Sequence, residues 1–176
     1  MKQYLSSEKI QELNRKLGET ISRDYAKILG PQDEVLVVVT LKGAMFFAAD
    51  LLRYVTVPCK VDFVRLTSYG SATKSTGTVR ILKDIEVSPT DQHVLVLDEI
   101  VDTGRTLQFL CDRLNAQKPR SLKVCALLSK PSRREIEVSV DYLGTEVEDK
   151  FLIGYGLDFG ERFRNLKDIC YLEDAP

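Results

Sequence analysis

One uninterrupted apolar segment, residues 35–39, constrains the fold of this chain more than any other feature. Four of its five residues are valine, whose branched side chain favours β-strands. A strand with one face in water alternates apolar and polar residues, whereas a strand covered on both faces is apolar throughout. The segment is also far too short to cross a membrane as a helix. We therefore expect residues 35–40 to form a strand that is buried on both faces.

The rest of the chain alternates helical patterns with further apolar strands. Residues 7–29 place apolar side chains three and four positions apart, which predicts a helix, and Gly30-Pro31 is expected to end it. Further helices are expected at residues 44–54 and 106–116, and strands at residues 59–66, 79–82, 94–97, 122–128, 138–143, 151–153 and 169–172. This alternation favours an α/β fold with a central, mostly parallel sheet flanked by helices. No repeat or linker divides residues 1–176, which predicts a single domain.

Composition argues against several classes of protein. The 25 basic and 26 acidic residues give a net charge of −1, whereas proteins that grip a nucleic-acid backbone usually have a basic excess. A structural zinc site is not expected, because the chain has a single histidine, His93, and four widely spaced cysteines. The first residues lack the apolar core of a signal peptide. We expect a cytoplasmic protein with reduced thiols and no nucleic-acid or membrane partner.

The residues that follow the predicted strands are the candidates for a ligand site. In open α/β sheets, ligands bind beyond the carboxyl ends of the strands. Three segments satisfy this condition: Lys42-Gly43, residues 98–106 and Lys130.

Residues 94–106 carry the most specific chemistry. An apolar strand leads to two adjacent carboxylates, Asp98 and Glu99, and Asp102 then begins a turn before a helix. Backbone N–H groups at a helix start bind anions, and Gly104 lets the chain approach a phosphate closely. Vicinal carboxylates suit a ribose diol or Mg²⁺. The alternative is an acidic turn that only caps the helix. The candidate residues are Asp98, Glu99, Asp102, Thr103, Gly104, Arg105 and Thr106.

The same segment resembles the ribose-phosphate motif of the type I phosphoribosyltransferases. Leu41-Lys42-Gly43 resembles the pyrophosphate loop of that family, and Lys130 together with residues 149–164 resembles its hypoxanthine-guanine branch. The resemblance covers about residues 5–172. It implies the type I phosphoribosyltransferase fold, with a core at about residues 30–145, a small hood lobe from the N-terminal and C-terminal segments, and a flexible lid loop.

The resemblance also implies an activity and roles for individual residues. The reaction joins a 6-oxopurine to phosphoribosyl pyrophosphate and releases pyrophosphate, with Mg²⁺ as cofactor and a homodimer or homotetramer as the usual assembly. Asp102 resembles the general base that removes the purine N7 proton. The implied metal residues are Asp98, Glu99 and Asp158; the pyrophosphate residues are Lys42, Gly43, Arg164, Ser68 and Tyr69; the purine residues are Lys130, Lys150, Phe151 and Leu152.

Two details qualify the resemblance. The branch usually has Glu-Asp where this chain has Asp98-Glu99, which leaves open which carboxylate faces the metal. In the family, the peptide bond that corresponds to Leu41–Lys42 is often cis.

Residues 67–78 allow two interpretations. Nine of these twelve residues are Ser, Thr or Gly, and no apolar period runs through them. One interpretation is a lid that closes over the reacting centre and excludes water, to which Ser68 and Tyr69 would belong. The other is a flexible surface hairpin.

Two functions of other classes are alternatives. A regulator of the same fold would bind the sugar phosphate and a nucleic acid, but no added basic segment is visible. A signalling receiver domain also places acids and a lysine at strand ends, but it is shorter and carries its acids on separate strands.

Overall fold

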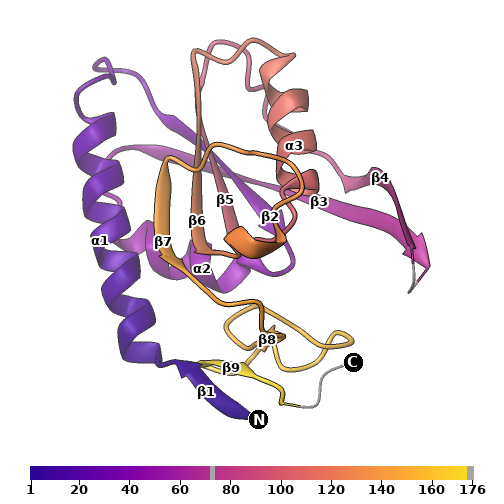
Figure 1. The fold of residues 1–176 in the computed structure, drawn as a ribbon. Coiled ribbons are helices and arrows are strands. Elements are labelled where there is room, and N and C mark those ends of the chain that lie inside the picture. Colours follow the sequence, from indigo (N-terminus) through magenta and orange to yellow (C-terminus); the bar gives the residue numbers. More distant parts are fainter. Residues whose placement is uncertain (72–73, 174–176) are drawn as a thin grey trace.

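A computed structural model describes residues 1–71 and 74–173, and the side chains of residues 68–78 lie outside the description. Its larger sheet has six strands in the order β4-β3-β2-β5-β6-β7 (Figure 1). Their bounds are β2 Val35–Leu41, β3 Cys59–Ser71, β4 Lys74–Lys83, β5 His93–Val101, β6 Ser121–Ser129 and β7 Tyr142–Glu146. Only β4 runs antiparallel to its neighbour. The expected α/β fold with a mostly parallel sheet is confirmed.

Helices cover both faces of this sheet, as the unbroken apolar strand requires. Helices α1 (Ser7–Tyr25) and α2 (Ala44–Leu51) lie on one face, and α3 (Arg105–Asn115) lies on the other (Figure 1). Successive residues of β2 alternate between the two cores: Val37 packs with α1 and α2, whereas Val38 packs with α3. Each buried aliphatic side chain contributes about 1.5–3 kcal/mol relative to an exposed one. Both layers therefore stabilise the same strand.

A second, smaller sheet forms a hood beyond the carboxyl ends of the parallel strands. It consists of β1 (Lys2–Leu5), β8 (Leu152–Ile153) and β9 (Ile169–Tyr171), all antiparallel, in the order β1-β9-β8 (Figure 1). Lys2 pairs with Tyr171, so the first strand and the last described strand of the chain lie side by side. Strand β1 was not predicted, because its four residues have no apolar pattern of their own.

Several predicted boundaries were wrong, and two of them have a clear local cause. Helix α1 ends at Tyr25 rather than near residue 29, because Tyr25 is its last fully buried residue and Ile28 is 46% exposed. The strand expected at residues 138–143 begins only at Tyr142. Before it, the Asp141 carboxylate accepts a hydrogen bond from the backbone N–H of Val124 (2.8 Å) and takes the place of a strand pair. Two short 3₁₀ helices, Leu52–Tyr54 and Pro131–Arg133, complete the elements.

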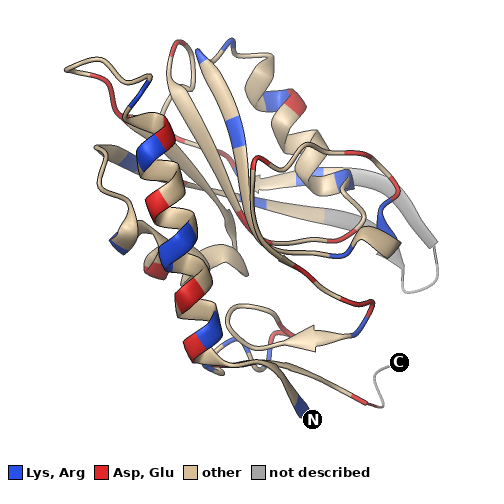
Figure 2. Cartoon of the chain, turned by 60° about the vertical axis from the view of Figure 1, so that its left-hand side comes forward, with Lys and Arg blue, Asp and Glu red and all other residues tan. Residues whose placement is uncertain are grey.

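The surface carries mixed charge. Lysine and arginine alternate with aspartate and glutamate along α1 (Figure 2), where Glu12 pairs with both Lys9 and Lys16. The four cysteines are free, and three of them are buried. Among the described residues, no helix is both long and apolar enough to cross a membrane.

Candidate active site

The acidic pair lies where the sheet opens between two strands. Strands β2 and β5 pair from Val35↔His93 to Val39↔Leu97, but β5 continues beside β6 as far as Val101. Asp98 and Glu99 therefore lie within β5 rather than after it, and the turn after β2 takes the place of a strand partner. The Thr40 hydroxyl donates a hydrogen bond to Asp98 Oδ1 (2.6 Å), and the Glu99 backbone N–H contacts the same oxygen (3.1 Å).

The environment of this pair disfavours negative charge. Burial raises the pKa of Asp98. Burial and the neighbouring Asp98 carboxylate raise the pKa of Glu99 well above its ordinary value, and Arg164 opposes the rise. Two half-buried carboxylates side by side are a site that a cation would stabilise. Mg²⁺ is commonly held by one or two carboxylates together with substrate phosphate oxygens, so the donor set fits that ion without a third protein ligand. Within the described part of the chain, no three acidic, histidine or cysteine side chains cluster as a metal site.

The turn after β2 packs tightly against both sides of the site. The Leu41–Lys42 peptide bond is cis, and Gly43 is buried at the start of α2. A Cβ atom on Gly43 would lie 1.7 Å from Oε1 of Glu99. A Cβ atom on Gly156 would lie 1.9 Å from the Gly43 carbonyl oxygen. The turn is thus enclosed between the acidic pair and a loop that lies more than a hundred residues away in sequence.

That distant loop presents Asp158 and Arg164. Arg164 donates to the Gly156 carbonyl (Nη1–O, 2.7 Å) and pairs with Asp158 (Nη2–Oδ1, 2.9 Å). The other Asp158 oxygen accepts the backbone N–H of Glu161 (2.8 Å). Glu161 also pairs with Lys42 (2.8 Å), so the loop is attached to the turn by an ion pair and by backbone packing. The Arg164 Nε atom is buried without a hydrogen-bond partner among the described residues.

The loop after β5 has the shape of an anion site. Gly104 has φ 86°, a left-handed conformation that favours glycine, and its Cβ would lie 2.3 Å from the Ile136 carbonyl oxygen. It directly precedes α3, so the first N–H groups of that helix are available to a ligand. A cavity of about 80 Å³ lies here, lined by Asp98, Ile100, Val101, Asp102, Thr103, Gly104, Thr106 and Leu107. The alternative of a capping carboxylate is wrong for Asp102, because Gly104 is the N-cap residue.

Two residues of the predicted ribose-phosphate set, Glu99 and Arg105, do not line this cavity. Arg105 points elsewhere. Its Nε donates to Glu135 (2.5 Å), and its side chain is 42% exposed. Its backbone N–H remains at the helix start and contacts the Thr103 hydroxyl at 3.4 Å.

A second cavity, of about 570 Å³, is bordered by three of the four residues assigned to the purine, which are Lys130, Lys150 and Phe151. It is lined by Lys130, Arg133, Asp149, Lys150, Phe151, Tyr171, Leu172 and Glu173. Lys130 is buried, donates to the Lys150 carbonyl (2.7 Å) and lies 3.6 Å from an Asp149 carboxylate oxygen, and its ammonium group carries three donors in all. Phe151 is 38% exposed and packs edge-on against Phe159, with ring centroids 5.4 Å apart. Leu152 is buried and paired with Tyr171 in the hood.

Sequence patterns missed several residues that hold these parts together. Arg133 pairs with Asp102 (Nε–Oδ1, 2.8 Å) and with Asp149 (Nη1–Oδ1, 3.4 Å), which links the anion loop to the purine cavity. The buried Tyr155 hydroxyl bonds Asn14 and Asp50. In the sequence, the only signal for these supporting residues is the pair of arginines, Arg133-Arg134, close after Lys130. The side chains of Ser68 and Tyr69 lie outside the described residues.

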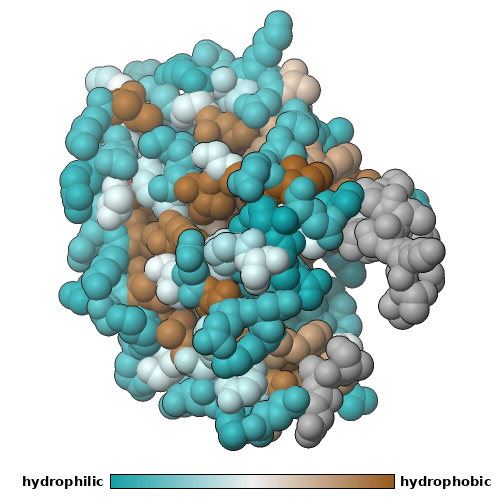
Figure 3. All heavy atoms as spheres, viewed as in Figure 1, coloured by the Kyte–Doolittle hydropathy of each residue, from teal (hydrophilic) through white to brown (hydrophobic). Residues whose placement is uncertain are grey.

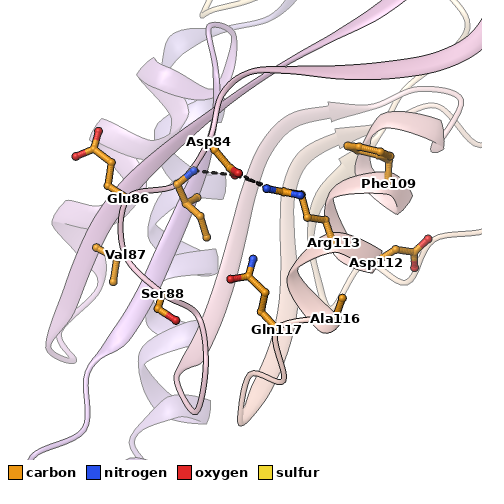
Figure 4. A pocket seen from close by; sticks show the side chains of 10 residues that line it. Asp84, Glu86, Val87, Ser88, Phe109, Asp112, Arg113, Ala116 and Gln117 are labelled. Atoms are coloured by element: carbon orange, nitrogen blue, oxygen red, sulfur yellow. Dashed lines mark hydrogen bonds and ion pairs between the residues drawn. The ribbon is translucent and has the colours of Figure 1, made fainter.

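Other surface features lie away from this site. A cavity of about 600 Å³ between the β4–β5 connection and α3 is lined by residues such as Asp84, Phe109 and Arg113, and an ion pair between Asp84 and Arg113 crosses it (Figure 4). On the face seen in Figure 3, hydrophobic residues appear as patches among hydrophilic ones.

Comparison with known proteins agrees with this geometry. The phosphoribosyl transferase domain family matches residues 1–160. The hypoxanthine-guanine phosphoribosyltransferase of Mycobacterium tuberculosis is 41% identical over 170 residues, covering 96% of this chain and 84% of that protein. The Bacillus subtilis protein of the same name is 38% identical over 175 residues, covering 99% and 94%. A crystal structure of a hypoxanthine-guanine phosphoribosyltransferase from Bacillus anthracis has a TM-score of 0.89 at 40% identity and covers 98% of each chain.

The chain therefore belongs to the phosphoribosyltransferase family. Its relatives place it in the hypoxanthine-guanine branch of that family.

Proposed function

We propose that this chain is a purine salvage enzyme. It transfers the 5-phosphoribosyl group from phosphoribosyl pyrophosphate to hypoxanthine or guanine, and it releases the nucleoside monophosphate and pyrophosphate. The observation that carries the proposal is the meeting of three groups at one edge of the sheet. These are the acidic pair of β5, the anion loop before α3 and the cavity between Lys130 and Phe151.

The purine cavity supports recognition of an oxo group at position 6. Lys130 carries only donors, and its ammonium group is buried against the Lys150 carbonyl. An oxo group facing Lys130 completes a charge-assisted hydrogen bond. The exposed face of Phe151 stacks on the purine, the backbone of Leu152 binds the base edge, and Lys150 borders the cavity.

The sugar phosphate occupies the loop after β5. Its 5′-phosphate binds the N–H groups around Gly104 and the hydroxyls of Thr103 and Thr106, with the Arg105 backbone as a further donor. The ribose hydroxyls and the metal share Asp98 and Glu99. Asp102, at the same loop, accepts the N7 proton as N9 forms the bond to the sugar.

Pyrophosphate is held on the opposite side of the acidic pair. Lys42 and Gly43 present backbone groups to it, Arg164 supplies positive charge, and Ser68 and Tyr69 belong to a lid formed by residues 67–78. The Asp98-Glu99 pair would hold Mg²⁺, and Asp158 would meet a second Mg²⁺ through water; the metal would supply charge neutralisation for the leaving group. Both Asp158 oxygens already have protein partners, which suits an indirect contact.

The assembly is proposed to be a homodimer or homotetramer in the cytoplasm. One experiment tests the function: the protein is mixed with Mg²⁺, phosphoribosyl pyrophosphate and each purine base in turn, and nucleotide formation is followed. Hypoxanthine and guanine should give product. Absence of product with all bases, combined with binding of RNA or DNA at low salt, would favour the regulator instead.

A further inference from the structure

Arg133 connects two parts of the site that are otherwise separate. It is the last residue of the 3₁₀ helix Pro131–Arg133, which begins directly after Lys130. Its backbone N–H bonds the Lys130 carbonyl (3.2 Å), so its position depends on that of Lys130. Its guanidinium then reaches Asp102 on one side (2.8 Å) and Asp149 on the other (3.4 Å). Asp149 lies 3.6 Å from the Lys130 ammonium.

The two oxygens of Asp102 are in different surroundings. Oδ1 lies 2.8 Å from Arg133 Nε as an ion pair without hydrogen-bond geometry, and it is buried, although the side chain as a whole is 43% exposed. The exposed part is therefore the remainder of the side chain, which includes Oδ2. The main chain of Asp102 is held as well, because Arg134 donates to its carbonyl (2.7 Å) and to the Ser129 hydroxyl (2.7 Å). Arg134 thus holds the backbone of Asp102 by a hydrogen bond, and Arg133 forms an ion pair with one of its carboxylate oxygens.

We propose that Arg133 is a positioning residue for Asp102. It holds Oδ1, so that Oδ2 points to the place where the purine N7 lies. This inference rests on the proposed role of Asp102 as the base. A carboxylate turns easily about its last side-chain bond, whereas a guanidinium fixed between two carboxylates restricts that rotation. Because Asp149 and Lys130 border the purine cavity, the same contacts align the base with the ring that it deprotonates.

The contact is suited to orientation rather than to stability. The side chains of Arg133 and Asp102 are 46% and 43% exposed, so solvent screens their attraction and its contribution to folding is small. Arg133→Met should therefore fold normally, with a melting temperature within about 4 °C of the parent. Arg113→Met is the matched control, because Arg113 also pairs with an aspartate and is 41% exposed, but it lies at the distant cavity of Figure 4.

The test is a double-mutant cycle measured with hypoxanthine as substrate. Arg133→Met should lower kcat by roughly tenfold to a hundredfold, because small misplacements of a reacting group cost about that much. The KM for phosphoribosyl pyrophosphate should change less than about twofold, and Arg113→Met should change neither constant. In the Asp102→Asn background, Arg133→Met should have almost no further effect, since the group that it positions is gone.

Three results would overturn the inference: a kcat for Arg133→Met within twofold of the parent, an increase in kcat, or a full loss that persists in the Asp102→Asn background. An increase would mean that Arg133 competes with the purine for Asp102. If Asp102→Asn alone keeps its kcat within threefold of the parent, the proposed base and the inference both fail. A strong effect of Asp102→Asn with an inert Arg133→Met removes only the inference.

Discussion

The carboxylate of Glu99 lies directly against the Cα atom of Gly43. An added Cβ there would come within 1.7 Å of Oε1 of Glu99, closer than any real contact. Gly43 is therefore glycine because an acidic side chain needs its space, and its own φ of −64° would suit any residue. On the far side of the same turn, Gly156 has φ 101° and approaches the Gly43 backbone. The two glycines are needed for different reasons, and this difference can be tested.

Gly43→Ala should impair catalysis more than folding. Its new methyl group meets the end of a flexible side chain, which can move away, but the displaced group is a carboxylate of the acidic pair. We expect kcat/KM for phosphoribosyl pyrophosphate to fall by on the order of tenfold or more. Gly156→Ala is the comparison: its methyl group would meet the Gly43 carbonyl oxygen, and Gly156 has a left-handed conformation, so the free energy of unfolding should fall by about 1–3 kcal/mol in addition to any effect on the turn. Urea unfolding and steady-state kinetics on both variants would separate the two effects, and the reverse pattern would contradict this explanation.

Turnover should depend on a divalent cation. The paired carboxylates of Asp98 and Glu99, whose pKa values burial raises, lie where the charge of pyrophosphate must be balanced. Exhaustive chelation should stop nucleotide formation, and added Mg²⁺ should restore it. A matched sample carried through the same steps without chelator controls for inactivation. Full activity after chelation would show that the acidic pair serves the ribose alone.

Lys130 should discriminate between purine bases. Adenine presents an amino group at position 6, so two donors would face each other, and its N1 lacks the proton that a backbone acceptor needs. Each buried unpaired group costs about 1–3 kcal/mol, which predicts a preference for hypoxanthine over adenine of roughly 10³-fold or more in kcat/KM. Lys130→Ala should weaken use of 6-oxopurines with little change in the KM for phosphoribosyl pyrophosphate.

Phe151→Ala is the counterpart of that variant. Stacking does not depend on the groups at the ring edge, so its loss should weaken hypoxanthine and guanine alike. Competition assays with each base would measure the ratio directly. Equal use of adenine and hypoxanthine by the parent would disprove the pocket role of Lys130 and leave the phosphoribosyltransferase activity intact.

Tyr155→Phe should destabilise the attachment of the loop that carries Asp158 and Arg164. The Tyr155 hydroxyl accepts a hydrogen bond from Asn14 (2.8 Å) and donates one to Asp50 (2.7 Å). These two partners belong to α1 and α2, which lie on the same face of the sheet. Burial and the Asp50 carboxylate raise the pKa of Tyr155, so the hydroxyl stays protonated at neutral pH. Its removal leaves the buried Asn14 amide without that partner, at a cost of about 1–3 kcal/mol.

The control for this prediction is Tyr4→Phe. The Tyr4 hydroxyl accepts one exposed bond, from the backbone N–H of Glu148 (3.1 Å), which water can replace. Its loss should cost less than about 0.5 kcal/mol. Equal destabilisation by the two variants, measured by chemical unfolding, would show that the buried hydrogen bonds of Tyr155 add nothing to the free energy of unfolding.

Local patterns in the sequence were sufficient for the layered fold and for the anion loop. Successive side chains of a strand point to opposite faces, so the apolar segment that forms β2 can be buried only if a layer covers each face of the sheet. The acids, the glycine and the helix start after β5 are contiguous in the chain, so their chemistry does not depend on distant contacts. The hairpin of β3 and β4 is longer than expected, because its outer part has no apolar period to mark it.

Tertiary structure alone decided how the parts of the site meet. Strand β1 exists because it pairs with β9, and Gly156 reaches Gly43 because the hood folds back over the sheet. Arg133 looks like an ordinary surface residue in the sequence, and only the folded chain places it between Asp102 and Asp149. Such contacts join segments that are far apart in the chain and are selected by packing of the whole domain. Sequence patterns report only local preference, and they therefore pointed to candidates for the reacting groups but not to the residues that hold them in place.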